Sequence, residues 1–497
     1  MPQQLTLDSL SAAVRGSAAA FRCRTRLQPA GGEGDKVFPP TYAGAVYATE
    51  KRRLPGKADP VDCVLLDSVQ SLANRIEDAL QQAIDGGALA MPLIVVNFGD
   101  AVADVWRVTS LQAPHRAADA ILRDSLTDQK DDKGKPLPFR KSEVGTAITN
   151  SSLANATGLF QYCPHALILG IWDSTGPKGG LGAKFARALV SEIVGIDIEI
   201  GARSRSRIDP LQIGLNAGPI YRLANGGWTI DPDEAIQEEK NGKLSGKACL
   251  YRRNKQKQNV YFEPGPLFEN AETKARAWTY HPKLAKVVRE TPATVTVKLF
   301  GENDTVEIGK DLLILSVPSS RIPKEGKPSS ANHGNVTPDT KDEDGTELVG
   351  GVTLSHAEHT AVLSLPQLRR LRFPIEKLPE GKTQMDVDNA ARTVLAALAL
   401  VGLTLSLERG CDLRSRCLLF PEGPLSFELL ETPGKPTPIT LDSTQAIGIY
   451  KQAVDAARNL GLPWDTTPIT LEPSPELIAL VKKSQELAAV GGEDEGE

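Results

Sequence analysis

The sequence has few aromatic residues, no closely spaced cysteine pair and no apolar run long enough to cross a membrane. Aromatics make up 5% of the chain, and its 6 cysteines include no Cys-x-x-Cys pair. This scatter excludes a disulfide framework and favours reduced thiols. The N-terminus lacks a basic start followed by an apolar core, so we expect no signal peptide. The longest apolar stretch, 394–407, stops short of the ~20 residues of a membrane span and predicts a buried helix. We therefore expect a cytoplasmic protein that does not contact a membrane.

An excess of positive charge is also missing. Lys and Arg number 57 against 62 Asp and Glu, which gives a net charge of -5. This balance excludes a uniformly basic nucleic-acid coat but leaves local basic patches open. The length of 497 residues allows about three domains or one domain with large insertions. The 43 glycines and 35 prolines indicate many loops and short elements.

Hydrophobic periodicity predicts an α+β fold. In the first half of the chain, strands and helices alternate in the order strand, helix, strand, repeated once. This is the ferredoxin-like, or RRM-like, order of two split βαβ halves around one antiparallel sheet. The expected strands are 17–27, 93–98, 166–172 and 196–207, and the expected helices are 64–84 and 183–194. In the second half we expect a strand at 360–365, helices at 387–405 and 444–460, and a hairpin of 416–420 with 425–430.

The composition shifts along the chain suggest five segments. An RRM-like palm with an insertion around 99–164 precedes a basic inserted region, and a loop rich in Pro, Gly, Ser and Asp follows. We expect the C-terminal part to complete the core and to end in a helix and a disordered acidic tail. The predicted segments are 1–224 for the palm, 225–321 for the basic region, 322–351 for the linker, 352–472 for the C-terminal part and 473–497 for the helix and tail.

Two triplets of alternating arginines are the first candidate site. Residues two apart on a strand share a face, so each triplet lines one side of its strand. Such a row repels itself unless an anion lies against it, and the guanidinium fork suits phosphate. A solvated edge strand that uses charge to discourage aggregation is the alternative. The triplets are Arg22, Arg24 and Arg26, and Arg203, Arg205 and Arg207.

Two further segments have the composition of a nucleic-acid contact. Ser174–Arg187 is a glycine-rich loop that we expect between a strand and a helix, where backbone N–H groups can face an anion. It is not a Walker A loop, because no Gly-Lys-Ser/Thr follows at the required spacing. Tyr251–Phe262 interleaves basic and aromatic residues, as single-strand-binding surfaces do, although a flexible basic loop would look the same. The candidate residues are Lys178, Gly179, Gly180, Lys184 and Arg187 in the first, and Arg252 and Arg253 in the second.

Catalytic and metal-binding patterns are weak. Cys163-Pro-His165 and His356-x-x-His359 could supply metal ligands, but the second lacks the HExxH pattern and structural roles are favoured for both. We therefore predict no catalytic residue, no metal and no cofactor.

Four strings together resemble the backbone subunit of type I CRISPR surveillance complexes (Cascade), a member of the RAMP superfamily, and in particular subtype I-G, formerly I-U. They are RLQPAGGEGDKVFPPTY from Arg26, VLLDSVQSLANRIEDAL from Val64, HALILGIWDSTGPKGGLGAKFARALVSEIVG from His165 and DLRSRCLL from Asp412. Within these strings we add Gln70, Asn74, Arg75, Arg414 and Arg416 to the predicted RNA contacts.

The resemblance implies an RRM-like palm with inserted finger and thumb elements. It implies that many copies stack along one CRISPR RNA, beside other subunits of the complex, and present the guide for pairing with target DNA. Base pairing then reads the sequence while the protein holds the backbone. Two alternatives remain open: a metal-independent endoribonuclease of the same superfamily with a histidine such as His165 as general base, and a nucleotide-binding enzyme that uses the Ser174–Lys184 loop.

Overall fold

The computed structural model divides the chain into two compact units, residues 1–204 with 339–486 and residues 205–338 with 487–497. Between residues 237 and 325 the backbone alone is described. The structure describes residues 2–491 with the exception of 45, 103–104, 177–182, 214–216, 225–226, 241–248, 254–258, 271–272, 282–295, 300–304, 308–311, 316–319, 324, 329–332, 342–344 and 346.

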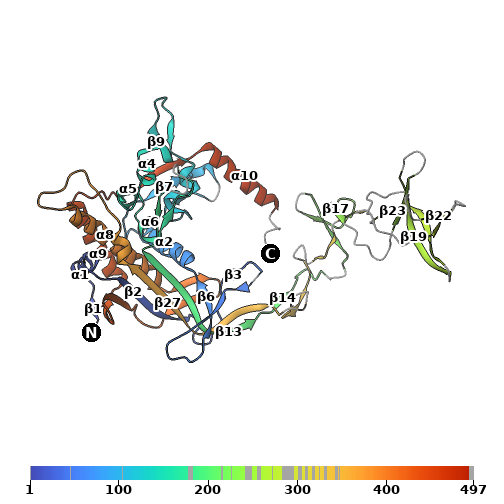
Figure 1. Ribbon diagram of the computed structural model, residues 1–497, viewed down its shortest axis with the longest axis horizontal. Helices are drawn as coiled ribbons and strands as arrows, with labels where there is room; N and C mark the ends of the chain where they lie inside the picture. The colour runs from blue at the N-terminus through green and yellow to red at the C-terminus, as the bar shows by residue number, and fades with distance from the viewer. Residues whose placement is uncertain are drawn as a thin grey trace. The chain divides into compact units, whose positions relative to one another are not determined.

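A ten-stranded sheet forms the base of the first unit (Figure 1). Its four central strands are neighbours in the order β2-β27-β13-β6, and each strand runs antiparallel to its neighbour. Alternate residues of β2 are buried, which places the first arginine triplet on the solvent side. These four strands are β2 (Ala20–Pro29), β27 (Val349–Ser364), β13 (Leu189–Ala202) and β6 (Val61–Asp67). The outer strands are β1 (Gln3–Gln4), β31 (Lys435–Thr440), β30 (Phe427–Thr432), β5 (Thr49–Arg52), β28 (Cys411–Arg414) and β29 (Cys417–Pro421).

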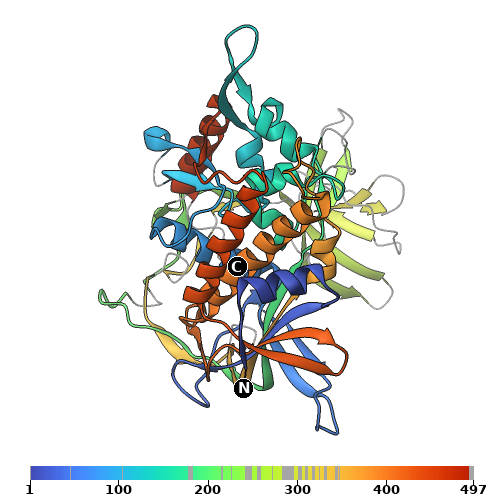
Figure 2. The ribbon, with the colours of Figure 1, turned by 90° about the vertical axis from the view of Figure 1, so that its left-hand side faces the viewer.

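Helices pack beside this sheet around α8 (Gln384–Leu407), which contacts α1 (Leu7–Arg15), α2 (Val69–Asp85) and α9 (Ser443–Asn459). Figure 2 shows α8 and α9 side by side. Helix α8 is long and apolar enough to cross a membrane, but 83% of its most apolar window is buried inside the protein. It is the core helix that the apolar run predicts. Gly402 lets α2 approach closely, because a Cβ there would lie 2.6 Å from Ile76 Cγ2.

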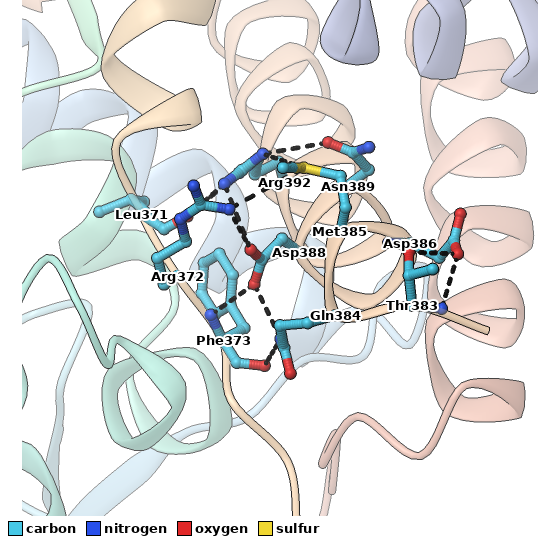
Figure 3. Close-up of polar contacts among 10 residues, drawn as sticks. All are labelled: Leu371, Arg372, Phe373, Thr383, Gln384, Met385, Asp386, Asp388, Asn389 and Arg392. Carbon is cyan, nitrogen blue, oxygen red and sulfur yellow. Dashed lines mark hydrogen bonds and ion pairs between the residues drawn. The ribbon is translucent and has the colours of Figure 1, made fainter. Parts of the chain in front are cut away.

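A buried carboxylate fixes the start of α8 to the preceding loop (Figure 3). Asp388 Oδ2 accepts a 2.7 Å bond from Arg372 Nη1, and its Oδ1 accepts from the Phe373 backbone N–H at 2.8 Å. Gln384 donates to the same Oδ1 at 3.0 Å, and the Arg392 guanidinium lies 3.6 Å from Oδ2. The Asp388 carboxylate is therefore hydrogen-bonded on both oxygens although it is fully buried.

A second sheet of the first unit joins segments far apart in the sequence. Strand β32 pairs in parallel with β7, with Ile469 opposite Ile94, and antiparallel with β9. The strands run β10-β9-β32-β7-β8. They are β10 (Pro136–Pro138), β9 (Ser125–Lys130), β32 (Ile469–Pro473), β7 (Ile94–Asn97) and β8 (Arg107–Thr109). The remaining helices are α3 (Ala120–Arg123), α4 (Glu143–Thr149), α5 (Thr157–Tyr162), α6 (His165–Leu169), α7 (Leu365–Arg369) and α10 (Pro475–Gly491).

The second unit is built from strands. Its largest sheet has six strands in the order β22-β21-β20-β19-β18-β23. These are β22 (Thr305–Glu307), β21 (Thr296–Leu299), β20 (Thr273–His281), β19 (Asn259–Asn270), β18 (Cys249–Arg253) and β23 (Leu312–Leu315). The basic region predicted at 225–321 lies within this unit. Residues 322–351 contribute β25 (Glu325–Gly326) and β26 (Val336–Asp339), and β26 pairs with β14 (Arg205–Arg207).

The α+β class is confirmed, while the finer ferredoxin-like order is not. The strand predicted at 166–172 is wrong, because α6 occupies most of it and only Ile171–Trp172 forms a strand, β11. The helix predicted at 183–194 is also wrong: β12 (Lys184–Phe185) and the start of β13 lie there. The helix predicted at 64–84 begins only at Val69, since 64–67 belong to β6. Strands β29 and β30 both pair with β2 and not with each other, so the predicted hairpin is absent.

Candidate nucleic-acid interface

An open groove of about 1090 Å³ in the first unit gathers four of the predicted RNA contacts. The N-terminal end of α2, the segment around α3, the β11–β12 ribbon and the end of α7 surround it. Gln70 and Asn74, one helical turn apart on α2 and both exposed, face it together with Lys184 and Arg187 of the ribbon segment. Residues that are distant in the sequence therefore form one surface.

The lining of this groove is strongly basic. Its only carboxylate among the described residues is Asp173, which is bound to Arg140 with a 2.7 Å N–O distance. A concave surface with one sign of charge attracts an extended anion. The cationic side chains that line the groove are Arg116, Arg123, Lys184, Arg187 and Arg370.

An exposed tryptophan stands at the groove beside a lysine. Trp172 and Lys184 are opposite partners across the antiparallel β11–β12 pair. The Trp172 side chain is 56% exposed, and Lys184 Nζ lies 4.9 Å from its ring centroid, within cation–π range. Sequence reasoning missed Trp172 because it ends an apolar run that predicts a wholly buried strand. The structure buries Ile171 and Asp173 on either side of the exposed Trp172, and no sequence pattern predicts this alternation.

The turn that follows Trp172 is fixed by polar contacts. Asp173 Oδ1 accepts from the Thr175 backbone N–H at 3.2 Å and from Arg140 Nη2 at 2.7 Å, and Arg140 also donates to the Thr175 carbonyl at 2.6 Å. On the other side, Gly170 has φ +87, and a Cβ there would lie 2.9 Å from Arg187 Cγ. Only glycine fits such a left-handed, crowded position without strain. The ribbon is thus held at both ends of β11.

A buried ion pair supports the groove from beneath. Arg116 Nε and Nη2 bind the two carboxylate oxygens of Glu77 at 2.6 and 2.9 Å, and Arg116 Nη1 donates to the Gly170 carbonyl at 3.0 Å. Burial raises the pKa of Glu77 to about 7, and the charge of Arg116 opposes this shift. Arg187 donates to the Leu169 carbonyl at 3.0 Å. Arg116 and Arg187 therefore shape the wall of the groove as well as charging it.

The first arginine triplet faces carboxylates of the same chain. Arg22 and Arg24 each lie 2.6 Å from a glutamate oxygen, of Glu428 and Glu358 respectively, and Arg26 lies 3.5 Å from Glu422. The shared solvent-facing side is as predicted. Because exposed ion pairs are worth about 0–1 kcal/mol, a phosphate could replace these glutamates as partners. The RNA contact stays a prediction.

The second triplet does not lie on one strand. Strand β13 ends at Ala202 and β14 begins at Arg205, and the two units divide between Arg203 and Arg205. Arg203 and Arg205 are exposed, whereas Arg207 donates to the carbonyls of His333 and Gly334 at 2.7 and 3.0 Å. The expected row of three guanidiniums on one strand is therefore wrong, although each residue can still contact RNA separately.

The arginines of the remaining strings make internal contacts. Arg75 Nε lies 2.9 Å from Asp67 Oδ2 and its Nη1 donates to the Asp412 carbonyl at 3.0 Å. Arg414 donates to the Leu66 carbonyl at 3.0 Å, so both side chains join β6, α2 and β28. Arg416 is exposed and its guanidinium lies 4.6 Å from the Phe38 ring centroid.

Some predicted contacts lie outside the described side chains. Lys178, Gly179 and Gly180 are outside the described residues. Arg252 and Arg253 lie on β18, where their backbone pairs with Val260 and Asn259 of β19. The expected helix after the glycine-rich loop is replaced by β12, so a helix N-terminus does not contribute to anion binding there.

Of the histidines considered for chemistry, His165 and His359 lie in the core, whereas His356 is only partly buried. His165 and His359 are both 0% exposed, and burial lowers the pKa of each to about 3. His165 Nε2 lies 3.1 Å from the Ser110 carbonyl oxygen, and His359 Nε2 lies 2.7 Å from Ser191 Oγ. Across the described part of the chain, no three His, Cys, Asp or Glu residues gather as metal ligands.

Comparison with known proteins gives one family. Residues 21–200 match the family described as CRISPR-associated protein GSU0053 (Cas_GSU0053). This match supports a CRISPR-associated protein. A search of curated proteins finds no match. The matched residues include β2, α2 and the β11–β12 ribbon, and so most of the lining of the groove.

Proposed function

We propose that the protein is a non-catalytic backbone subunit of a type I-G CRISPR surveillance complex, which binds CRISPR RNA and presents it for pairing with target DNA. Two kinds of evidence support this proposal. The first is the family match, which is at the level of a CRISPR-associated protein. The second is the sequence resemblance to the backbone subunit. The proposal includes stacking of further copies along the guide beside other subunits in the cytoplasm.

The basic groove carries the proposal. Five cationic side chains line it, of which Arg116 pairs with Glu77 and Arg123 with Asp124. Its one carboxylate among the described residues, Asp173, pairs with Arg140. The exposed Lys184 and Arg370 can contact successive phosphates, while the amides of Gln70 and Asn74 can bind ribose or base edges. Phosphate contacts position a strand without reading its sequence, as a subunit that must accept any spacer requires.

The histidine named for the endoribonuclease alternative, His165, is inaccessible. A general base must reach the proton that it abstracts. His165 is 0% exposed, and its pKa of about 3 reflects burial and the nearby Arg116 charge. The nucleotide-binding alternative depends on the Ser174–Lys184 loop, whose residues 177–182 are outside the described part, and it is left to experiment.

The decisive experiment compares RNA binding by wild type and by the double variant Lys184→Ala with Arg370→Ala. A matched control, Lys435→Ala with Lys451→Ala, removes two exposed lysines that do not line the groove. Each lost phosphate contact should flatten the slope of log affinity against log salt by about 0.7 for a single strand. We expect this change in the groove variant and not in the control. Equal binding by all three proteins would contradict the assignment of the groove.

A further inference from the structure

The groove contains a feature that phosphate binding leaves unexplained. An indole that is 56% exposed stands among cationic side chains, in a chain with only 5 tryptophans. Apolar surface of this size is stabilised by burial, and on a nucleic-acid surface the flat partner that buries it is a base. Trp172 therefore calls for a ligand with an aromatic face as well as a charge.

We propose that Trp172 is a stacking platform for one unpaired nucleobase of the RNA held in the groove. This inference rests on the proposed function and adds a base contact to the backbone contacts. Lys184 Nζ is positioned 4.9 Å from the ring centroid and leaves more than half of the side chain open. A base stacks on the open surface while the lysine charge lies near the adjoining phosphate. Stacking of this kind accepts any base, because every base has a π-face.

The platform is preorganised. The strand pairing of Trp172 with Lys184 sets the spacing of ring and ammonium. Asp173 and Arg140 hold the turn on one side with an N–O distance of 2.7 Å, and Gly170 with φ +87 holds the entry to β11 on the other. A ring that is already in place loses little conformational freedom when a base stacks on it.

Two amides that line the same groove add polar groups to the site. Gln70 and Asn74 line the same groove from α2, one turn apart. Each side-chain amide carries both donors and an acceptor, so the pair can satisfy the edges of purines and pyrimidines alike. The site therefore fits a single-stranded RNA whose base is unpaired at this point. The aromatic face of a free nucleotide has the same chemistry and must be distinguished by experiment.

The test compares two ligands that differ only in their bases. A uridine oligonucleotide and an abasic oligoribonucleotide of equal length are titrated against wild type, Trp172→Ala and Trp172→Phe. Loss of one base stack corresponds to roughly a 5- to 150-fold change in affinity. We expect wild type and Trp172→Phe to prefer the uridine ligand by this factor. Trp172→Ala should lose the preference but keep the salt slope, since its phosphate contacts remain.

Trp106 provides a matched control. It is 66% exposed and has Arg107 5.0 Å from its ring centroid, but it does not line the groove. Trp106→Ala should keep the preference for bases. A wild type that binds both ligands equally would overturn the stacking inference and leave the proposed function intact. Failure to bind either ligand would overturn the proposed function itself. Displacement of the uridine ligand by millimolar AMP with ATP hydrolysis would overturn both in favour of a nucleotide enzyme.

Discussion

Arg116 and Glu77 form a two-pronged ion pair beneath the basic groove, with N–O distances of 2.6 and 2.9 Å and both side chains less than 10% exposed. The backbone of Arg116 also has φ +54, a conformation that residues other than glycine rarely adopt. The pair therefore joins α2 to the groove wall at a position where the backbone is strained. Its integrity determines the shape of the surface that we propose for RNA.

Removing Arg116 should be strongly destabilising, and more so at higher pH. Breaking one half of a buried pair costs about 3–5 kcal/mol. Because the charge of Arg116 lowers the pKa of Glu77, its loss raises that pKa above about 7. At pH 6 both folded proteins hold the Glu77 proton, whereas at pH 8 the folded variant retains more of it than wild type while the unfolded chain has lost it, so the stability deficit grows with pH. The deficit of Arg116→Met against wild type, measured by urea unfolding, should be larger at pH 8 than at pH 6. Arg123→Met, which removes the partly exposed pair with Asp124, is the control and should cost less than about 1 kcal/mol. An equal deficit at both pH values would contradict this role of Glu77.

Acid should destabilise the fold through its buried histidines. The folded state holds His359 neutral with a pKa of about 3, whereas the unfolded chain takes up a proton below 6.5. Since the unfolded state then binds more protons, the free energy of unfolding falls as the pH drops below 6.5, by about 1.4 kcal/mol per pH unit for each such histidine. His359→Gln, which can still bond to Ser191, should reduce this slope between pH 6 and pH 4.5. An unchanged slope would show that His359 is not responsible.

Two neighbouring carboxylates at the start of α8 should behave differently (Figure 3). Asp388 is fully buried between arginines, so Asp388→Ala should lower the free energy of unfolding by about 3–5 kcal/mol. Asp386 lies at the exposed capping box with Thr383, and Asp386→Ala should cost about 0.5–2 kcal/mol. Urea unfolding of both variants checks the order. Similar losses in both would contradict the account of this network.

The glutamates opposite the first arginine triplet give a test of the phosphate-binding prediction. Glu358→Gln with Glu428→Gln removes the negative partners of Arg24 and Arg22. If RNA phosphates bind this face, RNA affinity should rise at low salt, because the arginines no longer have to exchange partners. Glu476→Gln with Glu486→Gln, two exposed changes on α10, controls for the same change in net charge. Equal affinities in all three proteins would favour the interpretation as a solvated strand face.

The parts of the fold with strong periodicity could be predicted from the sequence. The apolar run at 387–405 and the pattern at 444–460 became α8 and α9, and alternation placed Arg22, Arg24 and Arg26 on one face of β2. Short apolar runs could not be assigned to a helix or a strand, because 166–172 and 183–194 fit both the helical period and the strand period. Pairing of β13 with β27 along its whole length decided the second case.

The candidate site was predictable only in part, for a related reason. Lys184 and Arg187 belong to a glycine-rich string, but their approach to Gln70, Asn74 and Arg370 depends on tertiary packing. The glutamate partners of the first triplet come from β27, from β30 and from Glu422, which follows β29, all far along the chain. No local pattern shows a pairing between strands so far apart. The exposure of Trp172 likewise depends on which residues of the ribbon the core covers.

The most direct test of the central claim is the mass of the protein assembled on guide RNAs of increasing length. Copies that contact one another through two different surfaces form an open chain when the rotation between them does not close a ring, and on such a chain RNA length should set the number of copies. The mass of the protein component, measured by native mass spectrometry, should rise in steps of one 53.3 kDa subunit as the guide is lengthened. A protein mass that stays the same at every guide length, or a protein that does not associate with the guide, would contradict the account.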